Sequence, residues 1–89
     1  MFRMTVRDVF VIRNRGAVAT GCVESGQLNV GDEVRINDGP GVRVDGIEAS
    51  RKVRQTANLG DDVGLLFRTL EEGDVAAGDV ITSSGYFRA

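Results

Sequence analysis

Apolar and polar residues alternate along short runs of this chain, and the runs are separated by glycine, asparagine and aspartate. These turn residues recur about every 8 to 12 positions, which is typical of a small β-barrel or β-sandwich. No stretch shows the 3.6-residue period of an amphipathic helix. In the first run, Phe2 to Arg13, the even positions are apolar except for Asp8, and Val9 and Val11 are apolar as well. The end of this strand is therefore predicted to be apolar on both faces, either as a fully buried strand or as a surface that packs on a partner.

The whole pattern predicts about six strands with wide connections. They are expected over residues 2–13, 17–24, 33–37, 42–49, 63–68 and 80–82. The strand 63–68, "VGLLFR", is interpreted as fully buried, and Val53, Ala57 and Leu59 are expected to hold down the irregular segment before it. In the strand 17–24 one face should carry Ala17, Ala19, Gly21 and Val23. Because so few strands must hide their edges, the favoured fold is all-β, a small closed antiparallel barrel.

Two glycine patterns need interpretation. Gly16 and Gly21 have the spacing of a phosphate-binding P-loop, but Cys22 and Val23 stand where that loop has Lys and then Ser or Thr. We expect instead that Asn14 and Gly16 form a hairpin turn and that Gly21 lies in a strand too crowded for a side chain. The repeated "VGDEV", "LGDDV" and "AGDV" predict turns in which the aspartate hydrogen-bonds nearby backbone.

Length and composition predict one domain over residues 1–89, because 89 residues leave no room for a second core. The chain is 42% hydrophobic and 27% charged, as in ordinary soluble domains. It has neither an apolar run long enough to cross a membrane nor a signal-peptide layout, so a cytoplasmic protein is expected. The tail, residues 83–89, is expected to fray. Cys22 is the only cysteine, so an internal disulfide is excluded. The residue is interpreted as a packing residue.

The charge of −2 argues against a general nucleic-acid binder, which would usually be strongly basic. One tight basic cluster does occur, Arg51, Lys52 and Arg54 in "RKVR". It is interpreted either as a solvated loop or as a site for phosphate or carboxylate groups. With no histidine and one cysteine, a metal site or a nucleophile–base pair is not expected. The sequence therefore predicts neither an enzyme nor a cofactor.

The chain resembles the second domain of elongation factor Tu and related translational GTPases. The resemblance is carried in order by "MTVRDVFVIRNRGAVATGCVESGQLNVGDEVRI", "VDGIEASRK", "NLGDDVGLLFRTL" and "GDVI", and it extends from Met4 to Ile81. It implies a closed six-stranded antiparallel Greek-key barrel, in agreement with the strand pattern. In that family a separate preceding domain binds the nucleotide, so GTP binding is not expected of this chain.

The resemblance also implies a site. The family's G-V-E-x-x-R-K segment, which holds the aminoacylated end of tRNA, corresponds to residues 46–52. Glu48 would accept hydrogen bonds from the terminal adenosine, and Arg51 would approach the backbone or the aminoacyl end. Lys52 and Arg54 continue this basic segment, and Asp62 stands where the family has an asparagine in the amino-acid pocket. The alternative is that Glu48 and Arg51 simply pair with each other on the surface.

Departures from the family pattern include Cys22 for an arginine and Asn14 for a glycine, besides Asp62. The main functional hypothesis is a non-catalytic module that contacts tRNA or the ribosome. The alternatives are a regulatory domain that binds another protein through the apolar side of Val9 and Val11, or a fragment of a larger translation factor. The oligomeric state is left open.

Overall fold

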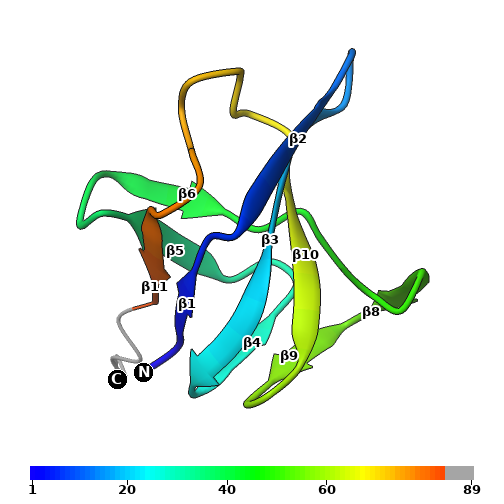
Figure 1. The fold of residues 1–89 in the computed structure, drawn as a ribbon, viewed down its shortest axis with the longest axis vertical. Helices are drawn as coiled ribbons and strands as arrows, with labels where there is room; N and C mark the ends of the chain where they lie inside the picture. Colours follow the sequence, from blue (N-terminus) through cyan, green and yellow to red (C-terminus); the bar gives the residue numbers. More distant parts are fainter. Residues whose placement is uncertain (84–89) are drawn as a thin grey trace.

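Over residues 1–83, which the structure describes, the computed structural model of the chain contains eleven strands and no helix (Figure 1). The strands are β1 (Arg3–Thr5), β2 (Asp8–Ile12), β3 (Gly16–Ser25), β4 (Gln27–Asn29), β5 (Glu33–Ile36), β6 (Gly41–Arg43), β7 (Gly46–Ala49), β8 (Lys52–Arg54), β9 (Thr56–Asn58), β10 (Asp62–Phe67) and β11 (Val80–Thr82). The predicted fraying of the tail concerns residues 83–89, and beyond Ser83 these are outside the described residues. No helix in the described part of the chain is long and apolar enough to span a membrane.

Nine of these strands form one strongly curled antiparallel sheet (Figure 1). Its order is β6-β5-β11-β1-β3-β10-β7-β8, and β2 pairs with β3 beside this path. The long strand β3 organises the sheet, because β10 pairs along one side of it while β2 and then β1 pair along the other. Strands β4 and β9 form a separate two-stranded ribbon. The all-β prediction is confirmed, whereas closure into a six-stranded barrel is not: over residues 1–83 the hydrogen-bonded path ends at β6 and at β8.

Two predicted strands are each broken in two, and at each break the backbone changes partner. The run 2–13 divides between β1 and β2 at Val6, whose N–H donates to Asp79 O at 2.8 Å, before Arg7 N–H donates to Thr20 O at 2.7 Å. The run 42–49 divides between β6 and β7 in the same way, where Val44 N–H donates to Asp32 O and Asp45 N–H to Leu66 O. The segment expected to be irregular contains β8 and β9. A sequence period does not show such changes because the partners lie far away along the chain.

The core lies inside the curl of the sheet, and its buried residues are all apolar in the described part of the chain. The prediction that Ala17, Ala19, Gly21 and Val23 share one face of β3 is confirmed. This is the inner face, since these four residues are buried while the alternate positions are half-buried or exposed. The other core members are Phe2, Met4, Val6, Leu28, Val34, Val44, Ile47, Ala49, Ala57, Val63, Leu65, Phe67, Val75 and Ile81. Gly21 is crowded as predicted, because a Cβ there would lie 2.5 Å from Thr5 O.

Burial differs from the prediction in three places. Of the two alternatives for the end of the first strand, the fully buried strand is excluded: Phe10 is 58% and Val11 49% exposed, because β2 extends beyond the core as a hairpin with β3. Val53 and Leu59 are 79% and 67% exposed and do not hold their segment, although Ala57 is buried as expected. Strand β10 alternates between buried and half-buried residues because one of its faces lies outside the curl.

The recurring Gly-Asp turn is confirmed at the atomic level. In each copy the aspartate carboxylate accepts a hydrogen bond of 2.7 to 2.9 Å from the backbone N–H three residues earlier, and the preceding glycine has a φ between 87° and 96°. The aspartates are Asp32, Asp61, Asp74 and Asp79. A positive φ at the third position is the mark of a type II turn, which favours glycine there. The copy at Asp74, in "EEGDV", is one that the sequence pattern did not predict.

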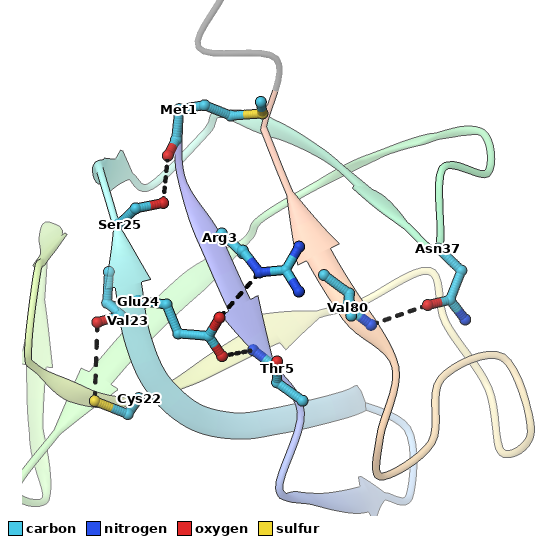
Figure 2. A network of polar contacts seen from close by, with 9 residues as sticks. All are labelled: Met1, Arg3, Thr5, Cys22, Val23, Glu24, Ser25, Asn37 and Val80. Carbon is cyan, nitrogen blue, oxygen red and sulfur yellow. Dashed lines mark hydrogen bonds and ion pairs between the residues drawn. The ribbon is translucent and has the colours of Figure 1, made fainter.

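A polar network ties β1 to β3 (Figure 2). Glu24 Oε1 accepts a hydrogen bond from Arg3 Nε at 3.0 Å, and Oε2 accepts one from Thr5 N–H at 3.1 Å. Ser25 Oγ donates to Met1 O at 2.8 Å beside them. The hydrogen bonds from Thr5 and then from Arg3 hold the pKa of the Glu24 carboxyl below its ordinary value of 4.5.

Glu24 is therefore expected to give the fold an acid-sensitive contribution. A carboxyl whose pKa is lowered on folding stabilises the protein above its unfolded-state pKa, and the stabilisation is lost as the pH falls through the folded-state value. Wild type should lose stability relative to Glu24→Gln as the pH drops below 4.5. Urea unfolding of both proteins at pH 7 and at pH 3 measures this difference. Parallel losses in the two proteins would show that Glu24 makes no such contribution.

Candidate functional site

The outer face of the sheet brings together residues from five strands in one row. Cross-strand partners share a face of the sheet. Val53 on β8 faces Glu48 on β7, Glu48 faces Gly64 on β10, and Gly64 faces Thr20 on β3. Thr20 in turn faces Asp8 on β2. Glu48 is therefore exposed in the middle of a surface whose neighbouring position, Gly64, carries no side chain.

This missing side chain coincides with a groove of about 370 Å³. Phe10, Ile12 and Val18 supply its apolar part, and a Cβ at Gly64 would lie only 3.0 Å from Val18 Cγ1. Its charged residues are Arg7, Glu48, Arg51 and Asp62. The groove thus combines an exposed aromatic ring with both signs of charge, and it opens to solvent.

The charges in the groove are only partly paired. Arg7 Nη1 lies 3.4 Å from Asp62 Oδ1, with both side chains more than half exposed. The other ion pairs over residues 1–83 are Arg3 with Glu24 and Arg43 with Asp45. Glu48 and Arg51 therefore do not pair with each other, and both remain available to a ligand.

Arg51 is placed by a tight turn between β7 and β8. Ala49 pairs with Lys52, so Ser50 and Arg51 form a two-residue hairpin loop, and their φ angles are 52° and 65°. Positive φ at both positions defines a type I′ turn, which usually contains asparagine and glycine. Non-glycine residues in this conformation are strained, so Ser50 and Arg51 stand where a merely structural turn would favour other residues.

The five residues predicted for the site divide into two groups. Glu48, Arg51 and Asp62 line the same groove. Lys52 and Arg54 are exposed but pair with the buried residues Ala49 and Ile47, which places them on the opposite face of β8.

Other residues of this surface were missed. In the first groove, Arg7 and Phe10 were not predicted. A second groove of about 340 Å³ was not predicted either, and it shares Ile12, Val18, Glu48 and Gly64 with the first. Arg15, Leu66 and Arg68 extend this groove toward the β2–β3 turn. The one signal for this surface in the sequence is the apolar run "DVFVI" between Arg7 and Arg13. The alternation of apolar and polar residues does not show that this run is exposed.

Cys22 lies outside both grooves. It is exposed, and its thiol contacts the carbonyl of Val23 at 3.8 Å (Figure 2). The thiol also contacts the carbonyl of Gly60 at 3.7 Å. The interpretation of Cys22 as a packing residue is wrong, because position 22 is exposed on the outer face of β3. Within residues 1–83, no three histidine, cysteine, aspartate or glutamate side chains gather where they could hold a metal ion.

Comparison with known proteins gives a family and a structural neighbour. The profile of the family described as elongation factor Tu domain 2 matches residues 16–82. Among solved structures, the chain is similar to the apo form of translation elongation factor SelB from Methanococcus maripaludis, with a TM-score of 0.84 and 27% sequence identity. The match covers 96% of this chain but only 19% of the SelB chain.

Proposed function

This chain belongs to the elongation factor Tu domain 2 family, and from this premise we propose that it is a non-catalytic binding module whose outer groove holds the acceptor end of a tRNA. The observation that carries the proposal is the meeting of Phe10, Glu48 and Arg51 in one open groove. An exposed aromatic ring offers a surface on which an unpaired base stacks. The module would work in the cytoplasm and would bind no nucleotide cofactor itself.

Each charged residue of the groove has a role in this proposal. The Glu48 carboxylate accepts hydrogen bonds from the ribose hydroxyls of the terminal nucleoside, which distinguish RNA from DNA. The planar Arg51 guanidinium binds phosphate or carbonyl oxygens. Asp62, held by Arg7, gives the aminoacyl end of the groove a negative group that suits an α-ammonium. Lys52 and Arg54, on the other face of β8, strengthen the attraction of the RNA backbone without contacting the terminal residue.

Binding of an RNA hairpin with a single-stranded, aminoacylated 3′ tail tests this proposal. Arg51→Gly should weaken binding about tenfold, since a hydrogen bond to a charged group is removed. Glycine suits the φ of 65° at this turn, so the variant should fold at least as well as wild type. Arg35→Ala is the matched control, because Arg35 is an exposed arginine on β5, away from both grooves. Fluorescence anisotropy over a series of salt concentrations measures the affinities.

Two results would count against the proposal. If Arg51→Gly binds like wild type, the assignment of the site is wrong. If wild type does not bind the hairpin even at low salt, where phosphate contacts are strongest, the RNA-binding role itself is wrong.

A second candidate function rests on strand β2. It pairs only with β3 among the described strands, and Phe10, Val11 and Ile12 are exposed along it. An apolar edge strand is a template for an added strand from another protein. A regulatory domain that binds a protein partner is therefore the alternative, and it predicts that Val11→Lys abolishes partner capture while leaving RNA binding unchanged.

A further inference from the structure

Arg15 and Arg68 come together at the far end of the groove system. A hollow of about 260 Å³ is lined by Asn14, Arg15 and Arg68, and both arginines also line the second groove. Arg15 belongs to the β2–β3 turn, and Arg68 directly follows β10. Both are exposed, and neither belongs to an ion pair within residues 1–83.

Backbone packing fixes the two arginines beside each other. A Cβ at Gly16 would overlap Phe67 O and would lie 2.7 Å from Arg68 Cα, so the turn packs directly on the end of β10. Asn14 has a φ of 65° and Arg15 N–H donates to Ile12 O at 2.9 Å, which closes the turn. The positions of the two arginines thus follow from the rigid part of the sheet rather than from a free loop.

Within residues 1–83, no carboxylate forms an ion pair with either arginine of this pair. Asp45, which lines the second groove, already accepts the Arg68 backbone N–H at 2.8 Å and lies 3.7 Å from Arg43. Glu71 and Glu72 line a third hollow together with Arg15 and Arg68, but within residues 1–83 neither carboxylate forms an ion pair with either arginine. Two guanidinium groups that line one hollow and have no ion-pair partner within residues 1–83 suit an oxyanion with several acceptor oxygens, of which a phosphodiester is the common polymeric case.

Resting on the proposed function, we propose that Arg15 and Arg68 bind a backbone phosphate of the same single-stranded RNA tail whose end lies at Glu48. Gly64, opposite Glu48, is four residues from Arg68 along the chain of β10, or about 13 Å at 3.3 Å per residue. This distance exceeds the rise of about 3.4 Å per nucleotide in a stacked strand, so Glu48 and the arginine pair contact different nucleotides of the tail. The apolar Ile12, Val18 and Leu66 line the path between them.

The test compares two RNA hairpins, one with a four-nucleotide single-stranded 3′ tail and one with a single-nucleotide tail. The double variant Arg15→Ala/Arg68→Ala should raise the Kd for the long tail about tenfold. It should also reduce the salt slope of log K by about 0.7 for each phosphate that is no longer neutralised. Binding of the short tail should be unchanged. The control Arg35→Glu lowers the net charge by the same amount on β5, outside these hollows, and should leave both affinities within about twofold of wild type.

Every other outcome overturns the proposal. If the double variant binds the long tail like wild type while Arg51→Gly loses affinity, the arginine pair is not a phosphate site and the proposed function stands. If the control loses as much as the test variant, net charge explains the effect. If wild type binds neither hairpin, the proposed function fails and this inference fails with it. Arg15→Lys/Arg68→Lys, which keeps the charge but loses bidentate geometry, should fall between wild type and the alanine variant.

Discussion

Gly16→Ala is expected to lower the free energy of unfolding by about 4 kcal/mol, which places it among the rare, strongly destabilising substitutions. Two causes combine at this position. Gly16 has a φ of 106°, where residues with a Cβ are strained, and the added Cβ would overlap Phe67 O. The neighbouring atom is backbone in a paired strand, so it cannot move aside without disturbing the β3–β10 ladder.

The matched control is Gly60→Ala. Gly60 has a similar φ of 87°, but a Cβ there meets nothing within 4 Å. Only the conformational strain remains, so the expected cost is about 1 kcal/mol. Urea unfolding followed by circular dichroism measures both variants against wild type. Equal losses of stability would mean that the contact with Phe67 is not what requires glycine at position 16.

The sequence predicted well the features that depend on neighbouring residues. The turn at Asn14 and Gly16, the alternating faces of β3 and the Gly-Asp turns each follow from a few consecutive side chains and their allowed φ angles. The breaks near Val6 and Val44 could not be predicted in this way, because they arise where the chain leaves one partner strand for another. The exposure of Phe10 was missed for a related reason: an apolar run has the same pattern whether a sheet covers it or ends before it.

The candidate site was predicted only where the resemblance supplied residues. Glu48, Arg51 and Asp62 meet because β10 pairs with β7 and a tight turn follows β7. Arg15 and Arg68 are 53 positions apart in sequence, and only the packing of the β2–β3 turn on the end of β10 brings them together. A linear motif does not contain this information.

Phe67→Ala and Phe10→Ala form the second pair of substitutions with a large expected effect. Phe67→Ala should lower the stability of the fold, whereas Phe10→Ala should weaken RNA binding. Phe67 is fully buried, so truncation removes its transfer free energy and leaves a cavity, at a cost of about 3 to 5 kcal/mol. A domain of this length has a total stability of about 4 to 13 kcal/mol. The variant should therefore be partly unfolded or close to it, and its urea midpoint should fall accordingly.

Phe10 is 58% exposed on the protruding hairpin, and its truncation should change stability by no more than about 0.5 kcal/mol. Its expected effect is on binding: without this ring for a base to stack on, the affinity for the RNA tail should weaken by about 1 to 3 kcal/mol. Unfolding and anisotropy measurements on the same two variants separate the roles. A Phe10→Ala protein that binds RNA like wild type would show that no base of the tail stacks on this ring.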